Sequence, residues 1–306
     1  VSPEYRHQSS TMATHEVKVP VFWGHIAVKT WGEATDPPIL MVHGVRDNAG
    51  SFDRLIPMLP PRFYYICPDL PSHGLSSKFP PHTMITSMDY ILTLKLILDH
   101  FKKEKYIFFG HSYGGQLLMM FAQIYPHYVS KLITLDSFYL LPMPTKSMMS
   151  DLVRNINKVI ALNNTKQRGI FYLDGVDKIK ETRMYENELD EEAAMCLADR
   201  CLAEHGKEMY IFSTDARISS RINPFFDLKV IIQMLHHYKI TCPFLFIYTT
   251  ETKEKYSDYC HAMIDAIRTM PKCRIEEISE NHDAHLNEPE SVAPLISKFL
   301  EELSKL

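Results

Sequence analysis

Short apolar runs alternate with helical patterns through the first half of the chain, and this alternation restricts the possible folds more than any other feature. Four runs are continuous enough for strands buried on both faces: "PILMVHG" (38–44), "FYYICPDLP" (63–71), "YIFF" (106–109) and "KLITLDSF" (131–138). Amphipathic helical patterns lie between them, the clearest at "SMDYILTLKLILDHF" (87–101). Such alternation predicts an α/β fold with a mostly parallel sheet and right-handed crossovers. Two alternating patterns at 16–22 and 24–31 predict a preceding hairpin.

The pattern changes after residue 138. Helical patterns separated by polar loops, with no strand pattern between them, fill residues 139–240. Strand and helix patterns then resume at "TCPFLFIYTT" (241–250) and continue to the end of the chain. We therefore expect one α/β core built from residues 1–138 and 241–306, with residues 139–240 inserted as a helical cap.

Composition excludes several classes of protein. The 306 residues are 45% hydrophobic and 23% charged, which is ordinary for a globular protein. A net charge of −4 gives no general attraction to nucleic acid, and no apolar run approaches the roughly 20 residues of a membrane span. The six cysteines are scattered without a CxxC pair, which favours reduced thiols in an intracellular protein and argues against a zinc site.

The chain ends in Ser304-Lys305-Leu306, the tripeptide that the peroxisomal import receptor reads at a free C-terminus. If Leu306 is the natural terminus, we expect the receptor as a partner and the peroxisome as the location. The cytoplasm is the alternative.

One serine lies in a run of glycines between a strand pattern and a helix pattern. In "YIFFGHSYGGQLLMMFA", the spacing Gly110-x-Ser112-x-Gly114 is typical of a nucleophile on a sharp strand-to-helix turn. The two glycines would relieve crowding where strand and helix approach closely. We therefore predict that Ser112 is a nucleophile.

A serine hydroxyl needs a base to remove its proton, and the base in this arrangement comes late in the chain. The loop "ENHDAHLNEPESV" offers His282 and His285. His282 lies directly after the last predicted strand and is our candidate base, whereas His285 is interpreted as a packing or supporting residue. The His-x-x-His spacing lacks an HExxH pattern, so no metal or cofactor is predicted.

The carboxylate that would orient the base is less well determined. Asp136 ends a predicted strand at the edge where the serine should lie, and it is our first candidate. The other usual position follows the strand "PFLFIYTT". The carboxylates there remain open as alternatives: Asp258, Glu254 and Glu251.

An acyl intermediate also needs backbone N–H donors for its oxyanion. The first should be the amide of Tyr113, directly after the nucleophile. The second should come from the turn after the strand "ILMVHG", at the amide of Val45.

Four segments together resemble the α/β-hydrolase superfamily: "HGVRDNAGSFDRLIP", "DLPSHGLSS", "GHSYGG" and "NHDAHLNEPESVA". Within it, the chain is most similar to the animal serine hydrolase-like (Kraken-type) group, over roughly residues 16–137 and 242–302. The resemblance implies an α/β-hydrolase fold, with the nucleophile at Ser112, the base at His282 and oxyanion amides at Val45 and Tyr113. The sequence departs from the family in having Asn281 where a glycine usually precedes the histidine.

The resulting hypothesis is a serine hydrolase that cleaves a small-molecule carboxylic ester or thioester through an acyl-enzyme. Aromatic residues in the insertion would suit a lipophilic group, or could form the insertion's own core: Phe171, Tyr172, Tyr210, Phe212, Phe225 and Phe226. The alternative is a non-catalytic binding protein that retains the hydrolase pocket. The same three residues would also serve a carbon–carbon bond hydrolase or a perhydrolase.

Overall fold

The computed structural model describes residues 12–81, 83–142, 145–163, 167–183, 188–220 and 227–302. These residues form an eight-stranded sheet with the order β1-β2-β4-β3-β5-β6-β9-β10. Its strands are β1 (Thr14–Val21), β2 (Gly24–Trp31), β3 (Pro38–Val42), β4 (Tyr64–Pro68), β5 (Tyr106–His111), β6 (Val129–Leu135), β9 (Phe244–Thr249) and β10 (Cys273–Ile278). The β1–β2 hairpin and the β2–β4 pair are antiparallel, and every later pair is parallel. The predicted α/β-hydrolase sheet is therefore confirmed.

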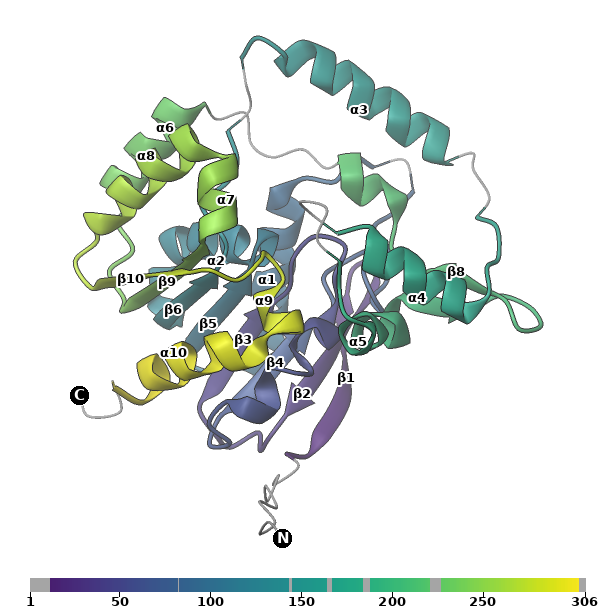
Figure 1. The fold of residues 1–306 in the computed structure, drawn as a ribbon, viewed down its shortest axis with the longest axis horizontal. Helices are drawn as coiled ribbons and strands as arrows, with labels where there is room; N and C mark the ends of the chain where they lie inside the picture. Colours follow the sequence, from purple (N-terminus) through teal and green to yellow (C-terminus); the bar gives the residue numbers. More distant parts are fainter. Residues whose placement is uncertain are drawn as a thin grey trace, which may run out of the picture.

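Helices cover both faces of this sheet (Figure 1). The core helices are α1 (Ser87–Phe101), α2 (Tyr113–Ile124), α7 (Thr250–Lys255), α8 (Ser257–Arg268), α9 (Ala284–Asn287) and α10 (Pro289–Glu302). Three short 3-10 turns accompany them: η1 (Ala49–Phe52), η2 (Ile56–Met58) and η3 (Pro126–Tyr128). Helices α1, α2 and α8 pack on one face, whereas η1, η2 and α10 pack on the other.

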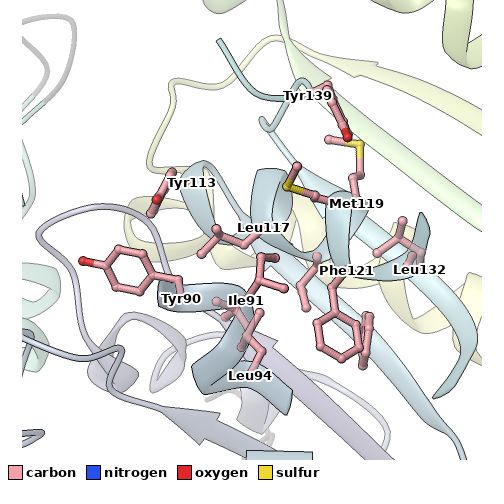
Figure 2. Close-up of a cluster of buried hydrophobic side chains, with 14 of the residues drawn as sticks. Tyr90, Ile91, Leu94, Tyr113, Leu117, Met119, Phe121, Leu132 and Tyr139 are labelled. Carbon is pink, nitrogen blue, oxygen red and sulfur yellow. The ribbon is translucent and has the colours of Figure 1, made fainter. Parts of the chain in front are cut away.

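Each buried strand contributes side chains to both faces, because neighbouring residues in a strand point in opposite directions. In β5, Phe108 joins the core under α1 and α2, whereas Ile107 and Phe109 join the core under α10. Figure 2 shows the first of these cores, with side chains of α1 and α2 in contact above the sheet. This burial on both faces explains why the strand runs are continuously apolar rather than alternating.

The segment between β6 and β9, residues 139–240, contains the insertion. Its elements are α3 (Met148–Asn163), α4 (Tyr172–Glu181), α5 (Glu191–Cys201), β7 (Leu202–Glu204), β8 (Tyr210–Phe212), η5 (Ala216–Ser220) and α6 (Leu228–His237). The expectation of helices without strands was wrong in one respect, because β7 and β8 form a small antiparallel hairpin. Helix α4 has no counterpart in the sequence prediction.

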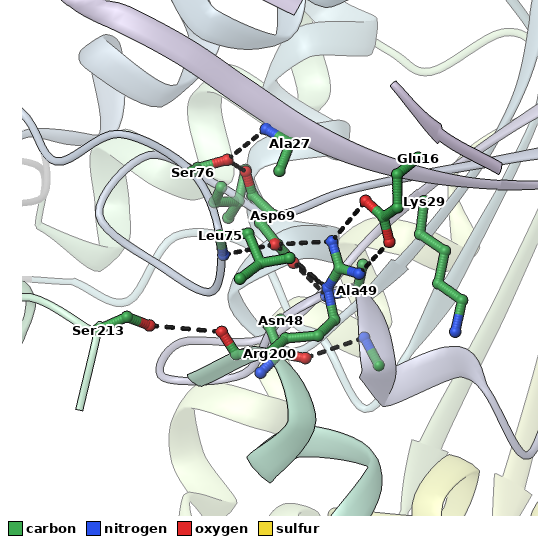
Figure 3. Close-up of polar contacts among 12 residues, drawn as sticks. Glu16, Ala27, Lys29, Asn48, Ala49, Asp69, Leu75, Ser76, Arg200 and Ser213 are labelled. Atoms are coloured by element: carbon green, nitrogen blue, oxygen red, sulfur yellow. Dashed lines mark hydrogen bonds and ion pairs between the residues drawn. The ribbon is translucent and has the colours of Figure 1, made fainter. Parts of the chain in front are cut away.

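Buried arginines join the insertion to the core. Figure 3 shows Arg200 of α5 between Asp69 and Glu16. Its guanidinium donates to Asp69 at 2.9 Å and forms an ion pair with Glu16 of β1. Asp69 follows β4 and also accepts the backbone N–H of Ala49 at 2.7 Å. The turn that follows β4, at residues 69–74, therefore anchors the insertion to the core.

None of the helices in the described part of the chain is long and apolar enough to cross a bilayer. All six cysteines fall within the described ranges, and each is a free thiol.

Candidate active site

Ser112 lies at the sharp turn from β5 into α2. Its backbone has φ 49° and ψ −121°, a conformation that costs a non-glycine residue about 1–3 kcal/mol. The flanking glycines make the turn possible. A Cβ on Gly114 would lie 2.1 Å from the carbonyl oxygen of Val42, and one on Gly110 would lie 2.5 Å from Cα of Gly115. This is the close approach of strand and helix expected from the glycine spacing.

Hydrogen bonds hold the strained serine in place. Its N–H donates to the carbonyl of Leu135 at 3.0 Å, while its own carbonyl accepts the hydroxyl of Ser137 at 2.5 Å. The N–H of Gln116 donates to the same carbonyl at 3.2 Å. These hydrogen bonds fix the backbone of Ser112 and therefore the position of its Cβ.

The structure brings together the serine, histidine and aspartate for which sequence analysis predicted a shared role. His282, in the loop after β10, has Nε2 3.0 Å from Oγ of Ser112. Its Nδ1 is 2.5 Å from Oδ2 of Asp136, which directly follows β6. Of the alternative carboxylates, Asp258 and Glu254 are exposed to solvent. Asp136 is thus the carboxylate that the structure places against His282.

Two threonines surround the carboxylate of Asp136. Oδ1 accepts the N–H of Thr249 at 2.9 Å and its hydroxyl at 3.0 Å, and Oδ2 accepts the hydroxyl of Thr252 at 2.6 Å. Burial alone would raise the pKa of Asp136, but its hydrogen bonds and the nearby His282 lower it below the ordinary value. Asp136 is therefore ionised at neutral pH. Sequence analysis did not identify these threonines, although both lie close to the C-terminal end of β9.

His282 is buried, with 4% of its surface exposed. Burial alone would lower its pKa, but the hydrogen bond and negative charge of Asp136, with a smaller effect from Asp283, raise the pKa above its ordinary 6.5. If Nδ1 donates to Asp136, the unprotonated Nε2 faces the hydroxyl of Ser112 and can accept its proton.

The two predicted oxyanion donors come from different parts of the fold. Tyr113 is the first residue of α2, where a helix does not use its own N–H groups. Val45 follows β3 and lines a cavity of about 250 Å³ together with Gly44, Ser112 and His282. Val45 therefore borders the space in front of the serine hydroxyl, and Tyr113 directly follows the serine along the chain.

An arginine of the insertion with 9% of its side chain exposed lies beside this cavity, and sequence analysis did not identify it. Arg183 donates to Asp47 at 2.6 Å and to Asp283 at 2.5 and 3.0 Å. Both carboxylates have exposed fractions of 1% or less. Burial opposes their ionisation, but the guanidinium lowers the pKa of Asp283 to about 2 and holds the pKa of Asp47 well below its ordinary value. Asp283 directly follows His282, and Asp47 lies two residues after Val45, but nothing in the sequence indicated that Arg183 would join them.

His111 packs against His282, and His285 packs against His111. His111 Nε2 is 2.9 Å from the carbonyl oxygen of His282, and the rings of His111 and His285 are 3.9 Å apart. His285 also contacts Ser51 through Nε2 at 2.7 Å. The imidazole of His285 thus supports the loop that carries His282, as the interpretation of a packing residue predicts.

Asp47, His111 and His285 offer three buried ligand atoms within 4.8 Å of one another. Arg183 already donates to the same carboxylate, so a cation bound there would face a guanidinium only 2.6 Å from Asp47. These residues do not fit a metal ion well, and we assign them to hydrogen bonding.

A second cavity adjoins the first. It has a volume of about 410 Å³ and shares four wall residues with the cavity of Ser112: Arg46, Thr182, Arg183 and Ser219. Its other walls include Ile179, Cys201, Phe212 and Ile218. Of the other aromatic residues noted in the insertion, Phe171 is 59% exposed and Tyr172 packs against Tyr210. Residues 225 and 226 lie outside the described ranges.

Comparison with known proteins finds a matching family model and two relatives that align over nearly the whole chain. A family model described as the alpha/beta hydrolase fold matches residues 37–171. The mouse serine hydrolase-like protein is 30% identical over 303 residues, which cover 95% of this chain and 97% of the mouse protein. The human serine hydrolase-like protein 2 is 30% identical over 299 residues, which cover 94% of each chain.

Among solved structures, a hypothetical protein from Pseudomonas aeruginosa has a TM-score of 0.79 at 21% identity, covering 94% of this chain and 99% of that one. At this identity the likeness supports the fold alone. Taken with the sequence relatives and the eight-stranded sheet, it shows that this chain belongs to the α/β-hydrolase superfamily and, within it, to the animal serine hydrolase-like group.

Proposed function

We propose that this protein is a serine hydrolase that cleaves a carboxylic ester or thioester through an acyl-enzyme. One observation carries the proposal above all others. Asp136, His282 and Ser112 form a continuous hydrogen-bonded chain that ends at the wall of a cavity. A base paired with a buried carboxylate on one side and a serine hydroxyl on the other is the arrangement that activates serine as a nucleophile.

In the first half of the proposed reaction, Oγ of Ser112 attacks the carbonyl carbon of the substrate while Nε2 of His282 takes the hydroxyl proton. The N–H groups of Val45 and Tyr113 donate hydrogen bonds to the carbonyl oxygen and stabilise the negative charge that develops on it. When the tetrahedral intermediate collapses, the bond to the alcohol or thiol breaks. His282 gives its proton to that leaving group, and the acyl group remains on Ser112.

In the second half, a water molecule gives a proton to His282 and attacks the acyl carbon. Collapse of the second intermediate releases the carboxylic acid and returns the proton to Ser112. Asp136 stays ionised throughout, because its hydrogen bonds hold its pKa below the ordinary value. Its role is to orient the imidazole and to stabilise the imidazolium.

The proposed cap, residues 139–240, supplies part of the substrate site. Thr182, Arg183 and Ser219 belong to the insertion, and all three line the same cavity as Ser112. The adjoining cavity is lined by apolar side chains such as Ile179, Phe212 and Ile218, which suits a lipophilic acyl or alkyl group.

Hydrolysis of a panel of p-nitrophenyl esters with increasing acyl length tests the proposal. We expect wild type to hydrolyse the panel, and Ser112→Ala and His282→Ala to lose on the order of 10⁴-fold or more in kcat. Ser150→Ala removes an exposed serine of α3 and serves as the control, with activity equal to wild type. If wild type hydrolyses no ester but binds the intact esters, the protein is the non-catalytic binding protein instead.

Peroxisomal import is a separate proposal, which rests on the C-terminal tripeptide alone; residues 303–306 lie outside the described ranges. A fluorescent protein fused ahead of the chain should accumulate in peroxisomes, and deletion of residues 304–306 should leave it in the cytosol. The same distribution with and without the tripeptide would refute this proposal.

A further inference from the structure

The cavity next to the serine has unusual charge for a site that is otherwise apolar. Its walls carry four charged side chains: Arg46, Lys178, Arg183 and Asp215. An apolar acyl chain needs none of them. Arg46 and Lys178 are exposed to solvent, and Arg183 and Asp215 are partly exposed. A charged side chain at the cavity wall is available to a ligand only where no neighbouring group of the protein neutralises it.

Two of the four are neutralised within the protein. Arg183 is paired with Asp47 and Asp283, as described above. Asp215 is paired with Arg217, whose Nη2 lies 2.7 Å from its carboxylate. Asp215 and Arg217 cancel, and Arg183 with its two aspartates carries a formal charge of −1, so neither group offers a positive charge to the cavity.

Arg46 and Lys178 are different. Neither forms an ion pair or a side-chain hydrogen bond with any residue of the described ranges. They come from two separate parts of the fold, because Arg46 belongs to the loop after β3 and Lys178 lies on α4 of the insertion. The wall of this cavity therefore carries two positive charges with which no side chain in the described part of the chain is paired.

Arg46 lies close to the residues of the proposed reaction. Arg46 borders both cavities and directly follows Val45, the proposed oxyanion donor. Its backbone has φ 68°, in the left-handed region that costs most side chains energy. Arg46 lines both cavities, whereas Lys178 lines only the second, so a substrate arm that extends from Ser112 into the second cavity has Arg46 at the shared wall.

We propose that the second cavity is a binding subsite for the anionic end of the substrate. On this inference, which rests on the proposed hydrolase function, the substrate is an ester or thioester with an apolar arm that carries a carboxylate or a phosphate. Arg46 and Lys178 contact that anion, while Ile179, Phe212 and Ile218 contact the apolar part of the arm. Guanidinium and ammonium groups are the side chains that bind carboxylate and phosphate best.

Two pairs of matched substrates test the subsite. The first pair is the p-nitrophenyl monoester of octanedioic acid and the same compound with its free carboxyl methylated. The second pair is the octanoyl thioester of phosphopantetheine and that of pantetheine. For each pair the measured quantity is the ratio of kcat/KM for the charged substrate to that for the neutral one, which cancels any general loss of activity.

We expect a ratio of about 10 or more in wild type for at least one pair, and the favoured pair identifies carboxylate or phosphate as the anion. Arg46→Gln and Lys178→Gln should each lower that ratio about fivefold, and the double variant should bring it close to 1. Lys180→Gln makes the same charge change on α4 at a position that does not line the cavity, so its ratio should equal that of wild type. Ratios near 1 in wild type for both pairs, or equal losses in Lys180→Gln, would overturn the subsite.

A binding measurement separates failure of the subsite from failure of the proposed hydrolase function. Ser112→Ala is titrated with the charged and the neutral compound of each pair, with and without the two glutamine substitutions. If wild type cleaves nothing but the anionic compound binds more tightly in a manner that depends on Arg46 and Lys178, the subsite stands and the hydrolase function falls. If wild type cleaves the neutral compounds equally well and binding shows no preference, the subsite falls and the hydrolase function stands.

Discussion

Replacement of Arg183 by methionine should destabilise the protein strongly. The guanidinium makes three hydrogen bonds to Asp47 and Asp283, and both carboxylates are buried. Removal of one partner from a buried ion pair typically costs about 3–5 kcal/mol, because the remaining charge is left without compensation. A loss of 1 kcal/mol lowers the melting temperature of a domain of 150–250 residues by about 2–4 °C. At the lower figure of about 2 °C, which suits this longer chain, we expect a fall of roughly 6–10 °C.

The effect should depend on pH in a defined direction. In wild type, Arg183 holds the pKa of Asp283 at about 2, so this pair stabilises the fold above the ordinary carboxyl pKa of 3.8 and is lost only as pH falls toward 2. Without the guanidinium, burial is no longer opposed, and the pKa of each aspartate rises above its ordinary value. The variant is then penalised most at pH 7–8 and recovers as its carboxylates gain protons on acidification.

Thermal unfolding followed by circular dichroism at pH 8, 7, 6 and 5 measures both effects. Arg154→Met is the matched control, because Arg154 is 71% exposed and pairs with Asp151 within one helix of the insertion. That substitution should cost less than about 1 kcal/mol at every pH. The reasoning is refuted if Arg183→Met destabilises no more than the control, or if its deficit relative to wild type grows as the pH falls.

Three further predictions concern the hydrogen-bonded chain and its turn. The raised pKa of His282 predicts that kcat/KM of wild type falls on acidification with a midpoint above pH 6.5. In Asp136→Asn we expect that midpoint below pH 6.5 and a kcat lower by on the order of 10⁴-fold. A midpoint equal to that of wild type would contradict this prediction. Gly114→Ala should lower the free energy of unfolding in urea by more than about 2 kcal/mol, because its Cβ would lie 2.1 Å from Val42; a stable variant would disprove the tight turn. Thr252→Val removes the 2.6 Å bond to Asp136 and should cost about 1–3 kcal/mol in the same assay, whereas no loss would show that this bond contributes nothing.

The sheet was predictable because its strands are continuous apolar runs, a pattern that burial on both faces requires. Helix α4 was not, because Gly175 interrupts a short polar sequence and glycine is a poor helix former. The structure shows close packing at this glycine: a Cβ there would lie 2.7 Å from the end of the Leu202 side chain, which would have to move to make room. Strands β7 and β8 span three residues each, too few for a period to be visible in the sequence.

Ser112 and His282 could be selected from local patterns, because a glycine-flanked turn and a loop after the last strand have few alternatives. The carboxylate could not be selected with the same certainty, since chain order allows an acid after either of two strands. The structure places Asp136, directly after β6, against His282. Because β6 and β9 are neighbours in the sheet, Thr249 and Thr252 also contact the Asp136 carboxylate. The Arg183 network was beyond prediction from sequence, because its partners lie 100 and 136 residues away.

Covalent labelling with a fluorophosphonate tests most directly whether Ser112 is an activated nucleophile. The probe reacts with a serine only when a neighbouring base has made its hydroxyl nucleophilic, so it reports the serine and the histidine together. We predict one adduct per chain in wild type, located by peptide mass spectrometry at Ser112, with none in Ser112→Ala and strongly slowed labelling in His282→Ala. No adduct in wild type, an adduct on another residue, or equal rates in wild type and His282→Ala would contradict the account.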